Sequence, residues 1–180
     1  FTITNDGFEP RVNAQDIIRL QADDGSAEVR LDASGQDYIS FLTETTERLR
    51  INNQGNVGIG TTSPSYKLDL VGDLRVLSSS INYQQNTDVD TGTETIATVN
   101  TGSFDGAFFD YLIKSGSNLR AGTVTAVHDG TNVEYNEVST QDLGSTSVVE
   151  LSVDISGADM RLRATTTSDD WLIKSLVRTI

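Results

Sequence analysis

The 180-residue chain contains no cysteine, only two prolines and a single histidine. Without cysteine there can be no disulfide bond or thiolate metal site, so packing and hydrogen bonding must hold the fold together. No apolar run approaches the roughly 20 residues of a transmembrane helix, and we expect no membrane insertion. Asp and Glu number 26 against 13 Lys and Arg, and this net charge of −13 disfavours a nucleic-acid partner.

The residue types that are frequent favour β-structure. Thr, Ser, Val and Ile recur throughout, and the 15 glycines stand mostly between short apolar segments. Branched residues fit the pleated surface of a sheet, whereas Gly, Asp and Asn fit the turns that join strands. The composition therefore predicts an all-β fold.

Residues 1–80 contain a recurring triplet in which two apolar residues flank a residue that is usually polar or glycine. Turns containing Gly, Asp or Asn separate the triplets. In a strand, the two apolar residues point to one face and the residue between them points to the other. The apolar positions are Ile18, Leu20, Val29, Leu31, Ile39, Phe41, Leu49, Ile51, Val57, Ile59, Leu68, Leu70, Leu74 and Val76.

A single chain with this pattern has a narrow apolar stripe and open sheet edges, and open edges invite pairing with other chains. We therefore expect residues 1–80 to form a repetitive β-stalk in which three copies intertwine about one axis, with the apolar positions along that axis. A monomeric β-solenoid is the alternative. The polar stretch 81–92 is interpreted as a linker to a second domain.

The segment RLRINNQGNVGIGTTSPSYKLDLVGD, residues 48–73, resembles the NVGIGTTSP…KLDV.G segment of bacteriophage tail fibres, tailspikes and related virion proteins. The resemblance implies a homotrimeric stalk, location in the virion and extracellular action. It also implies other tail proteins as N-terminal partners. Because the chain begins at Phe1 in the middle of the triplet pattern, we expect it to be the C-terminal part of a longer polypeptide.

Residues 93–180 contain longer alternating segments with turns between them, which predict an antiparallel, jelly-roll-like β-sandwich. The expected strands are 93–99, 106–114, 119–128, 133–140, 148–155, 160–166 and 171–180. Residues 104–180 also resemble globular domains at the C-terminal end of marine phage tail proteins, through the string FFDYLIKSGSNLRAGTVTAVHDGTNVEYNEVST and the final DWLIKSLVRTI.

These resemblances imply a receptor-binding protein, an adhesin that attaches a virion to a bacterial surface glycan or an outer-membrane protein. Aromatic side chains are common anchors in such contacts, and the candidates are Tyr83, Tyr135 and Trp171. Two other functions stay open: a module of a polysaccharide depolymerase, and a domain that only caps and trimerises the fibre.

The sequence offers no constellation typical of catalysis, and we expect neither an enzyme nor a cofactor. Most carboxylates fall in turns, where they accept hydrogen bonds from backbone N–H groups. His128 has no Ser–His–Asp or metal-ligand spacing around it; it is either a strand-end residue or, in three copies on an axis, a metal ligand. The acidic segment 88–94 lacks the third acid of a calcium loop, and we predict no metal site there.

Asp110 stands in an otherwise apolar segment, and a buried acid needs a partner. Arg120 on the next expected strand is the natural candidate. We predict that Asp110 and Arg120 form a structural pair at a sheet or subunit junction.

Overall fold

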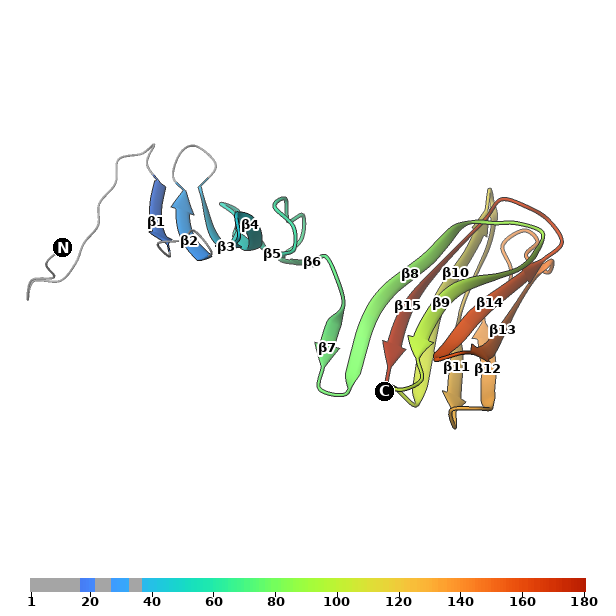
Figure 1. The fold of residues 1–180 in the computed structure, drawn as a ribbon. Coiled ribbons are helices and arrows are strands. Elements are labelled where there is room, and N and C mark those ends of the chain that lie inside the picture. The colour runs from blue at the N-terminus through green and yellow to red at the C-terminus, as the bar shows by residue number, and fades with distance from the viewer. Residues whose placement is uncertain (1–16, 22–26, 33–36) are drawn as a thin grey trace, which may run out of the picture. The chain divides into compact units, whose positions relative to one another are not determined.

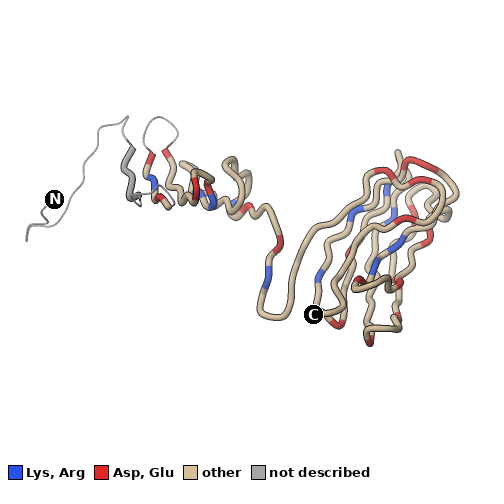
Figure 2. The backbone as a smooth tube through the Cα atoms, viewed as in Figure 1, with Lys and Arg blue, Asp and Glu red and all other residues tan. Residues whose placement is uncertain are grey.

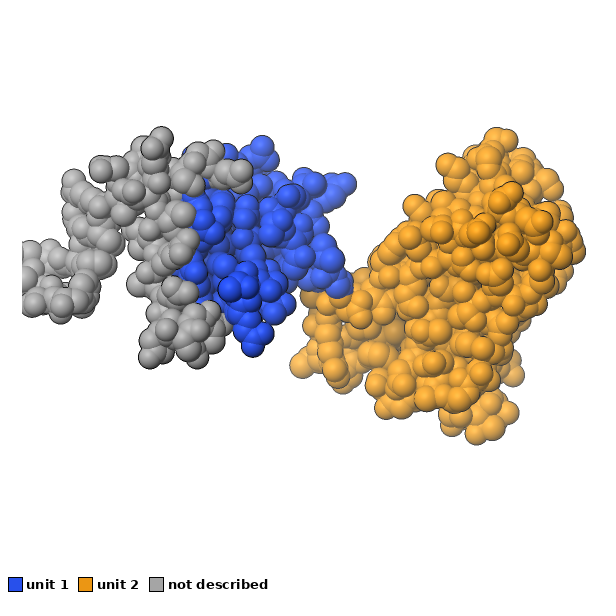
Figure 3. Space-filling view, turned by 45° about the horizontal axis from the view of Figure 1, so that its top comes forward, with its two compact units in different colours: residues 1–72 blue, residues 73–180 orange. Residues whose placement is uncertain are grey.

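The computed structural model describes residues 17–21, 27–32 and 37–180. Every regular element in these ranges is a β-strand, which confirms the all-β prediction. The described residues contain no helix of the length and apolarity needed to cross a membrane. The chain divides into unit 1, residues 1–72, and unit 2, residues 73–180, which are coloured separately in Figure 3.

The strands of unit 1 form a single six-stranded sheet in which neighbours in sequence are neighbours in space (Figure 1). All pairs are antiparallel except β5 with β6, which run parallel. The strands are β1 (Ile17–Gln21), β2 (Ala27–Asp32), β3 (Tyr38–Thr43), β4 (Thr46–Ile51), β5 (Val57–Ile59) and β6 (Leu68–Leu70).

The loop between β5 and β6 explains why the GIGTTSP string needs its glycines. A Cβ atom on Gly58 would lie 2.7 Å from the carbonyl oxygen of Thr61, and Gly60 has a φ of +74°. The first position therefore has no room for a side chain, and the second has a backbone conformation that side chains disfavour. Asn56 fastens the loop, because its buried amide donates to the carbonyl oxygen of Pro64 at 3.2 Å.

Unit 2 is a sandwich of two antiparallel sheets, which agrees with the predicted antiparallel β-sandwich (Figure 1). The large sheet has the order β12-β11-β10-β15-β8-β7, and the small sheet has the order β13-β14-β9. The strands are β7 (Leu74–Val76), β8 (Ser79–Val89), β9 (Gly92–Asn100), β10 (Gly106–Ser115), β11 (Asn118–His128), β12 (Val133–Ser139), β13 (Val149–Ser156), β14 (Asp159–Thr166) and β15 (Trp171–Thr179).

The hydrophobic core of unit 2 lies between these two sheets. Phe109, Ile113 and Ile173 contribute to it from the large sheet, and Met160 and Leu162 from the small sheet; all five side chains are fully buried. Each comes from the inward positions of a strand with a two-residue period. The alternation recognised in the sequence therefore sets the core.

The stretch 81–92, expected to be a linker, instead contains most of β8, which pairs with β15 in the large sheet. Val89 in this stretch enters the core, whereas Gln84, which also points inward, binds backbone instead. The side-chain amide of Gln84 donates to the carbonyl oxygen of Thr98 at 2.8 Å and accepts from the Thr98 N–H at 2.9 Å. The boundary between the compact units falls earlier, so Leu74 and Val76 belong to β7 of the sandwich rather than to the expected stalk.

Candidate functional site

The main candidate site is the apolar face of unit 1, made by the predicted apolar pairs from β1 to β6. Strand pairing aligns these positions into two rows that cross all six strands. The first row is Ile18, Leu31, Ile39, Ile51, Val57 and Leu68. The second row is Leu20, Val29, Phe41, Leu49, Ile59 and Leu70.

Within a single chain the described side chains of this apolar face, from β2 onward, are exposed or only half-buried. From residue 29 onward none of its side chains is buried, and Phe41 and Leu68 are 43% and 64% exposed. A contiguous apolar surface of this kind on a soluble protein typically marks an interaction site. The placement of these residues at a trimer axis remains a prediction.

The opposite face of the same sheet is polar, yet it is the better covered of the two. Ser40 is completely buried, and Asp32 is 6% exposed and lies 2.7 Å from the guanidinium of Arg30. The guanidinium of Arg50 lies 3.7 Å from the centre of the Tyr38 ring. Long charged and aromatic side chains shield this face with their own stems, as Arg commonly does. Within one chain, therefore, the polar face of this sheet is more buried than the apolar face.

In unit 2 the predicted pair of Asp110 with Arg120 is wrong. Asp110 accepts from Arg178 at 2.8 and 3.2 Å and from the hydroxyl of Thr123 at 2.7 Å, and the hydrogen bond from Arg178 lowers the pKa of its carboxyl. Strand register is the reason: Arg120 pairs with Ile113, which points into the core, whereas Asp110 points to the outward face.

Arg120 instead belongs to a polar cluster at the margin of the core. Its guanidinium donates to the carbonyl oxygen of Val149 at 2.9 Å and lies 3.8 Å from a carboxylate oxygen of Glu137. The same carboxylate accepts a hydrogen bond from the hydroxyl of Tyr111. Burial, together with this carboxylate, raises the pKa of Tyr111 to about 12, so the hydroxyl remains a donor at physiological pH.

The three predicted receptor-contact aromatics are not brought together. Trp171 is 3% exposed in the core, and its indole N–H donates to the hydroxyl of Ser168 at 2.9 Å. Tyr83 and Tyr135 are 54% and 44% exposed. Tyr83 pairs with outward Leu176, whereas Tyr135 pairs with Ala126, which faces the core, so the two tyrosines belong to opposite faces of the large sheet.

A groove of about 320 Å³ in unit 2 was not foreseen from the sequence. Asp73, Arg75, Asn82 and Asn100 line it together with Phe104. Charged and amide groups around an aromatic ring suit a polar ligand that also presents an apolar surface. The contributing residues come from β7 and the residue before it, from β8, and from the end of β9 and the loop that follows. Only the fold brings them together, and no local motif signals them.

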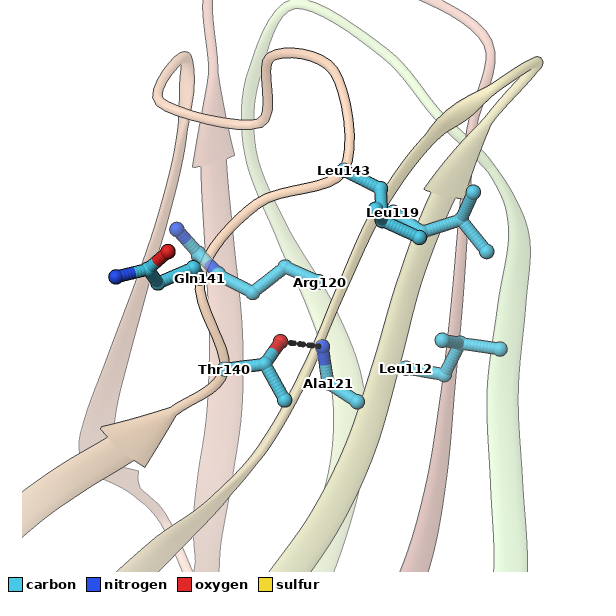
Figure 4. A pocket seen from close by; sticks show the side chains of 7 residues that line it. All are labelled: Leu112, Leu119, Arg120, Ala121, Thr140, Gln141 and Leu143. Carbon is cyan, nitrogen blue, oxygen red and sulfur yellow. Dashed lines mark hydrogen bonds between the residues drawn. The ribbon is translucent and has the colours of Figure 1, made fainter.

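A second hollow, of about 290 Å³, lies on the outward side of the large sheet (Figure 4). Leu112, Leu119, Ala121 and Leu143 make its lining largely apolar. The loop that carries Leu143 is held in place because Leu119 and Leu143 exchange backbone hydrogen bonds of 2.8 and 2.9 Å. This hollow extends the outward face toward the end of β10.

His128 uses both ring nitrogens inside its own chain. Its Nδ1 accepts from the Gly130 N–H at 2.9 Å, so Nε2 carries the hydrogen and donates to the carbonyl oxygen of Phe104 at 2.7 Å. The adjacent Asp129 accepts from Asn132 and Thr131, and these hydrogen bonds lower its pKa to about 2. His128 is thus a strand-end residue that holds the β11–β12 turn, with no nitrogen left for a metal.

The fold supplies the third acid that the segment 88–94 lacks in sequence. Carboxylate oxygens of Asp88, Asp90 and Asp170 lie within 4.8 Å of one another at the end of the sandwich where β8 meets β9. All three residues are exposed. Exposed acidic groups often gather without an ion, and we assign no metal to this cluster.

No protein-family model and no curated protein matches the chain. The structure itself defines an all-β protein with two units. One unit is a two-sheet sandwich, and the other is a single sheet whose apolar face has no buried side chain from residue 29 onward.

Proposed function

We propose that the chain is the distal part of a phage tail fibre, with a homotrimeric stalk built from unit 1 and a sandwich tip built from unit 2. The observation that carries this proposal is the apolar face of unit 1. Its two continuous rows cross all six strands, and from residue 29 onward none of their side chains is buried within one chain. Two further copies would bury these rows and pair the open edges of the sheet.

In this proposal unit 2 acts as the adhesive end, which attaches the virion to a bacterial surface glycan or an outer-membrane protein. The groove around Phe104 and the exposed ring of Tyr135 support this role, because sites that recognise polar surfaces combine aromatic area with a few polar groups. Trp171 is too buried to take part. Three tips on one stalk would strengthen weak single contacts through avidity.

The stalk is tested by the mass of the full chain in solution at micromolar concentration. We expect three chains per particle, and we expect Ile59→Asp to yield single chains because a charge in a buried apolar row is strongly unfavourable. Thr62→Asp is the matched control, since it adds the same charge to an exposed loop position of the same unit and should leave the trimer intact. A monodisperse monomer of the unmodified chain would overturn the proposal.

The adhesive role is tested by incubating the chain with bacterial cells and with purified capsule or lipopolysaccharide. We expect binding that Arg75→Ala and Asn82→Ala weaken, without release of reducing ends. Release of reducing ends would favour the depolymerase alternative instead. The absence of both binding and turnover would favour a domain that only caps the fibre.

A further inference from the structure

The two outward surfaces of the unit 2 sandwich differ in chemistry. The small sheet presents polar side chains, including Glu150, Asp154 and Arg161, and its strands contain no exposed large hydrophobic residue. The outward face of the large sheet is rich in exposed apolar side chains. Examples within the strands include Leu74, Ile81, Tyr83, Val127, Val138 and Leu176, each between 39% and 67% exposed.

Strand register shows that these residues form a continuous surface. One row crosses five neighbouring strands through successive cross-strand pairs. Its members, in order from β8 to β12, are Tyr83, Leu176, Asp110, Thr123 and Val138. Leu112 lies two positions along β10 from Asp110 and leads into the apolar hollow of Figure 4. A continuous row of exposed apolar side chains on one side of a sandwich is atypical of a surface that is permanently exposed to solvent.

The charge of this face favours a second copy of the same chain as its partner. In β15, β10, β11 and β12 it carries Lys114, Lys174 and Arg178 against Asp110 and Glu134, a surplus of one positive charge. The whole chain has a net charge of −13, and in unit 2 many acidic positions lie at the turns (Figure 2). Identical copies can therefore meet through this face with little of the repulsion that the rest of the surface would impose.

Continuity with the stalk favours the same partner. β7, which follows β6 closely in the chain, carries Leu74 at the edge of this face, and Leu74 pairs with Ile81. A trimeric stalk would also hold three sandwiches at high local concentration, so even a weak apolar contact between them would form.

We propose that the outward face of the large sheet is a second self-association surface, through which the sandwiches of neighbouring copies meet. This inference rests on the proposed trimeric stalk. It removes Tyr83 from the receptor-contact residues, because Tyr83 would be buried between copies. Tyr135 and the groove around Phe104 remain accessible.

Thiol labelling of single-cysteine variants tests this surface, because the chain has no native cysteine. Leu176→Cys and Val138→Cys sample the middle and the edge of the face, and Glu150→Cys on the small sheet is the exposed control. In the full chain we expect both face positions to react with a maleimide at least about tenfold more slowly than the control, since burial between copies restricts access to transient opening. In an Ile59→Asp background, where the stalk no longer joins the copies, this protection should disappear.

The possible failures are distinguishable. If the chain is trimeric by mass but Leu176→Cys and Val138→Cys label as fast as Glu150→Cys, the stalk stands and the second surface does not. The same result, followed by slow labelling only when bacterial cells or glycans are added, would mean that the face binds a receptor and would also overturn the inference. If the chain is monomeric by mass, the proposed function fails and the inference fails with it.

Discussion

Units 1 and 2 are built from the same kind of alternating strand, yet unit 2 buries its inward apolar side chains and unit 1 leaves its apolar face partly exposed. In unit 2 a second sheet covers the inward positions, and Phe109, Ile113 and Leu162 are fully buried. In unit 1 a single sheet leaves Phe41 and Ile59 exposed while Ser40 on the other side is buried. The comparison teaches that alternation decides which residues share a face, whereas a covering layer decides which face becomes the core.

The largest expected effect, and the sharpest test of this comparison, is that unit 1 selectively loses its folded structure when the chain is diluted. We expect backbone amides of residues 38–59 to lose protection from hydrogen exchange as the chain is diluted, because a fold completed by other copies depends on protein concentration. Trp171, the only tryptophan, is buried in unit 2, so its fluorescence reports that unit separately and should change far less. Equal protection of 38–59 at all concentrations would show that unit 1 is stable alone.

The next largest expected effect is the loss of stability when an aromatic ring is removed from the core of unit 2. Phe109→Ala should lower the free energy of unfolding by about 3–5 kcal/mol, because a fully buried ring leaves a cavity. Its neighbour Phe108 provides a matched control, since it is the same residue type on the same strand but points to the outward face. Denaturant melts in the Ile59→Asp background, where neighbouring copies no longer cover the outward face, should show by Trp171 fluorescence that Phe108→Ala costs less than half as much as Phe109→Ala. Similar costs would mean that the outward face is as well packed as the core.

A smaller effect distinguishes the two arginines of unit 2. Arg120→Ala should destabilise the unit by about 1–3 kcal/mol, because the buried carbonyl of Val149 loses its donor. Arg178→Ala should cost less than about 1 kcal/mol, because its pair with Asp110 is largely exposed. Thermal melts of both variants under one buffer condition measure the difference. A larger loss of stability from Arg178→Ala than from Arg120→Ala would show that the pair of Asp110 with Arg178 stabilises unit 2 more than the Arg120 cluster does.

The smallest expected effect is a change in acid sensitivity. The hydrogen bond from Arg178 lowers the folded-state pKa of Asp110 below its unfolded value of about 3.9. Stability from this group is therefore present above about pH 4 and is lost as the pH falls through the lower folded value. Asp110→Asn should reduce the slope of melting temperature against pH in that acidic window and leave it unchanged near pH 7. Asp73→Asn is a suitable control, because the Asp73 carboxyl makes no hydrogen bond or ion pair with the other described residues.

Local patterns in the sequence predicted much of this structure. The triplets of residues 1–80 marked the strands of unit 1, and the alternation after residue 93 marked the strands of the sandwich. Two kinds of error remained. The polar stretch 81–92 was interpreted as a linker, although it contains most of β8. Its polarity is explained in part by Gln84, which hydrogen-bonds to the backbone of Thr98 instead of filling the core. Arg120 was paired with Asp110 because it stands on the next strand, although strand register places the two side chains on opposite faces.

The candidate sites were less predictable than the fold. The apolar rows of unit 1 follow from local spacing, so their members were identified without a structure. The groove around Phe104 joins β7, β8 and β9, and the acidic cluster joins Asp88 and Asp90 to Asp170 from the far end of the chain. Neither grouping has a local signal.

The sequence by itself determined the strand type and the sets of side chains that share a face, because both depend on a two-residue period within a few neighbouring residues. Only the tertiary structure decided which face is covered, which charges pair and which strands adjoin. Those outcomes depend on register and on the stacking of one sheet against another, and contacts between distant parts of the chain set both.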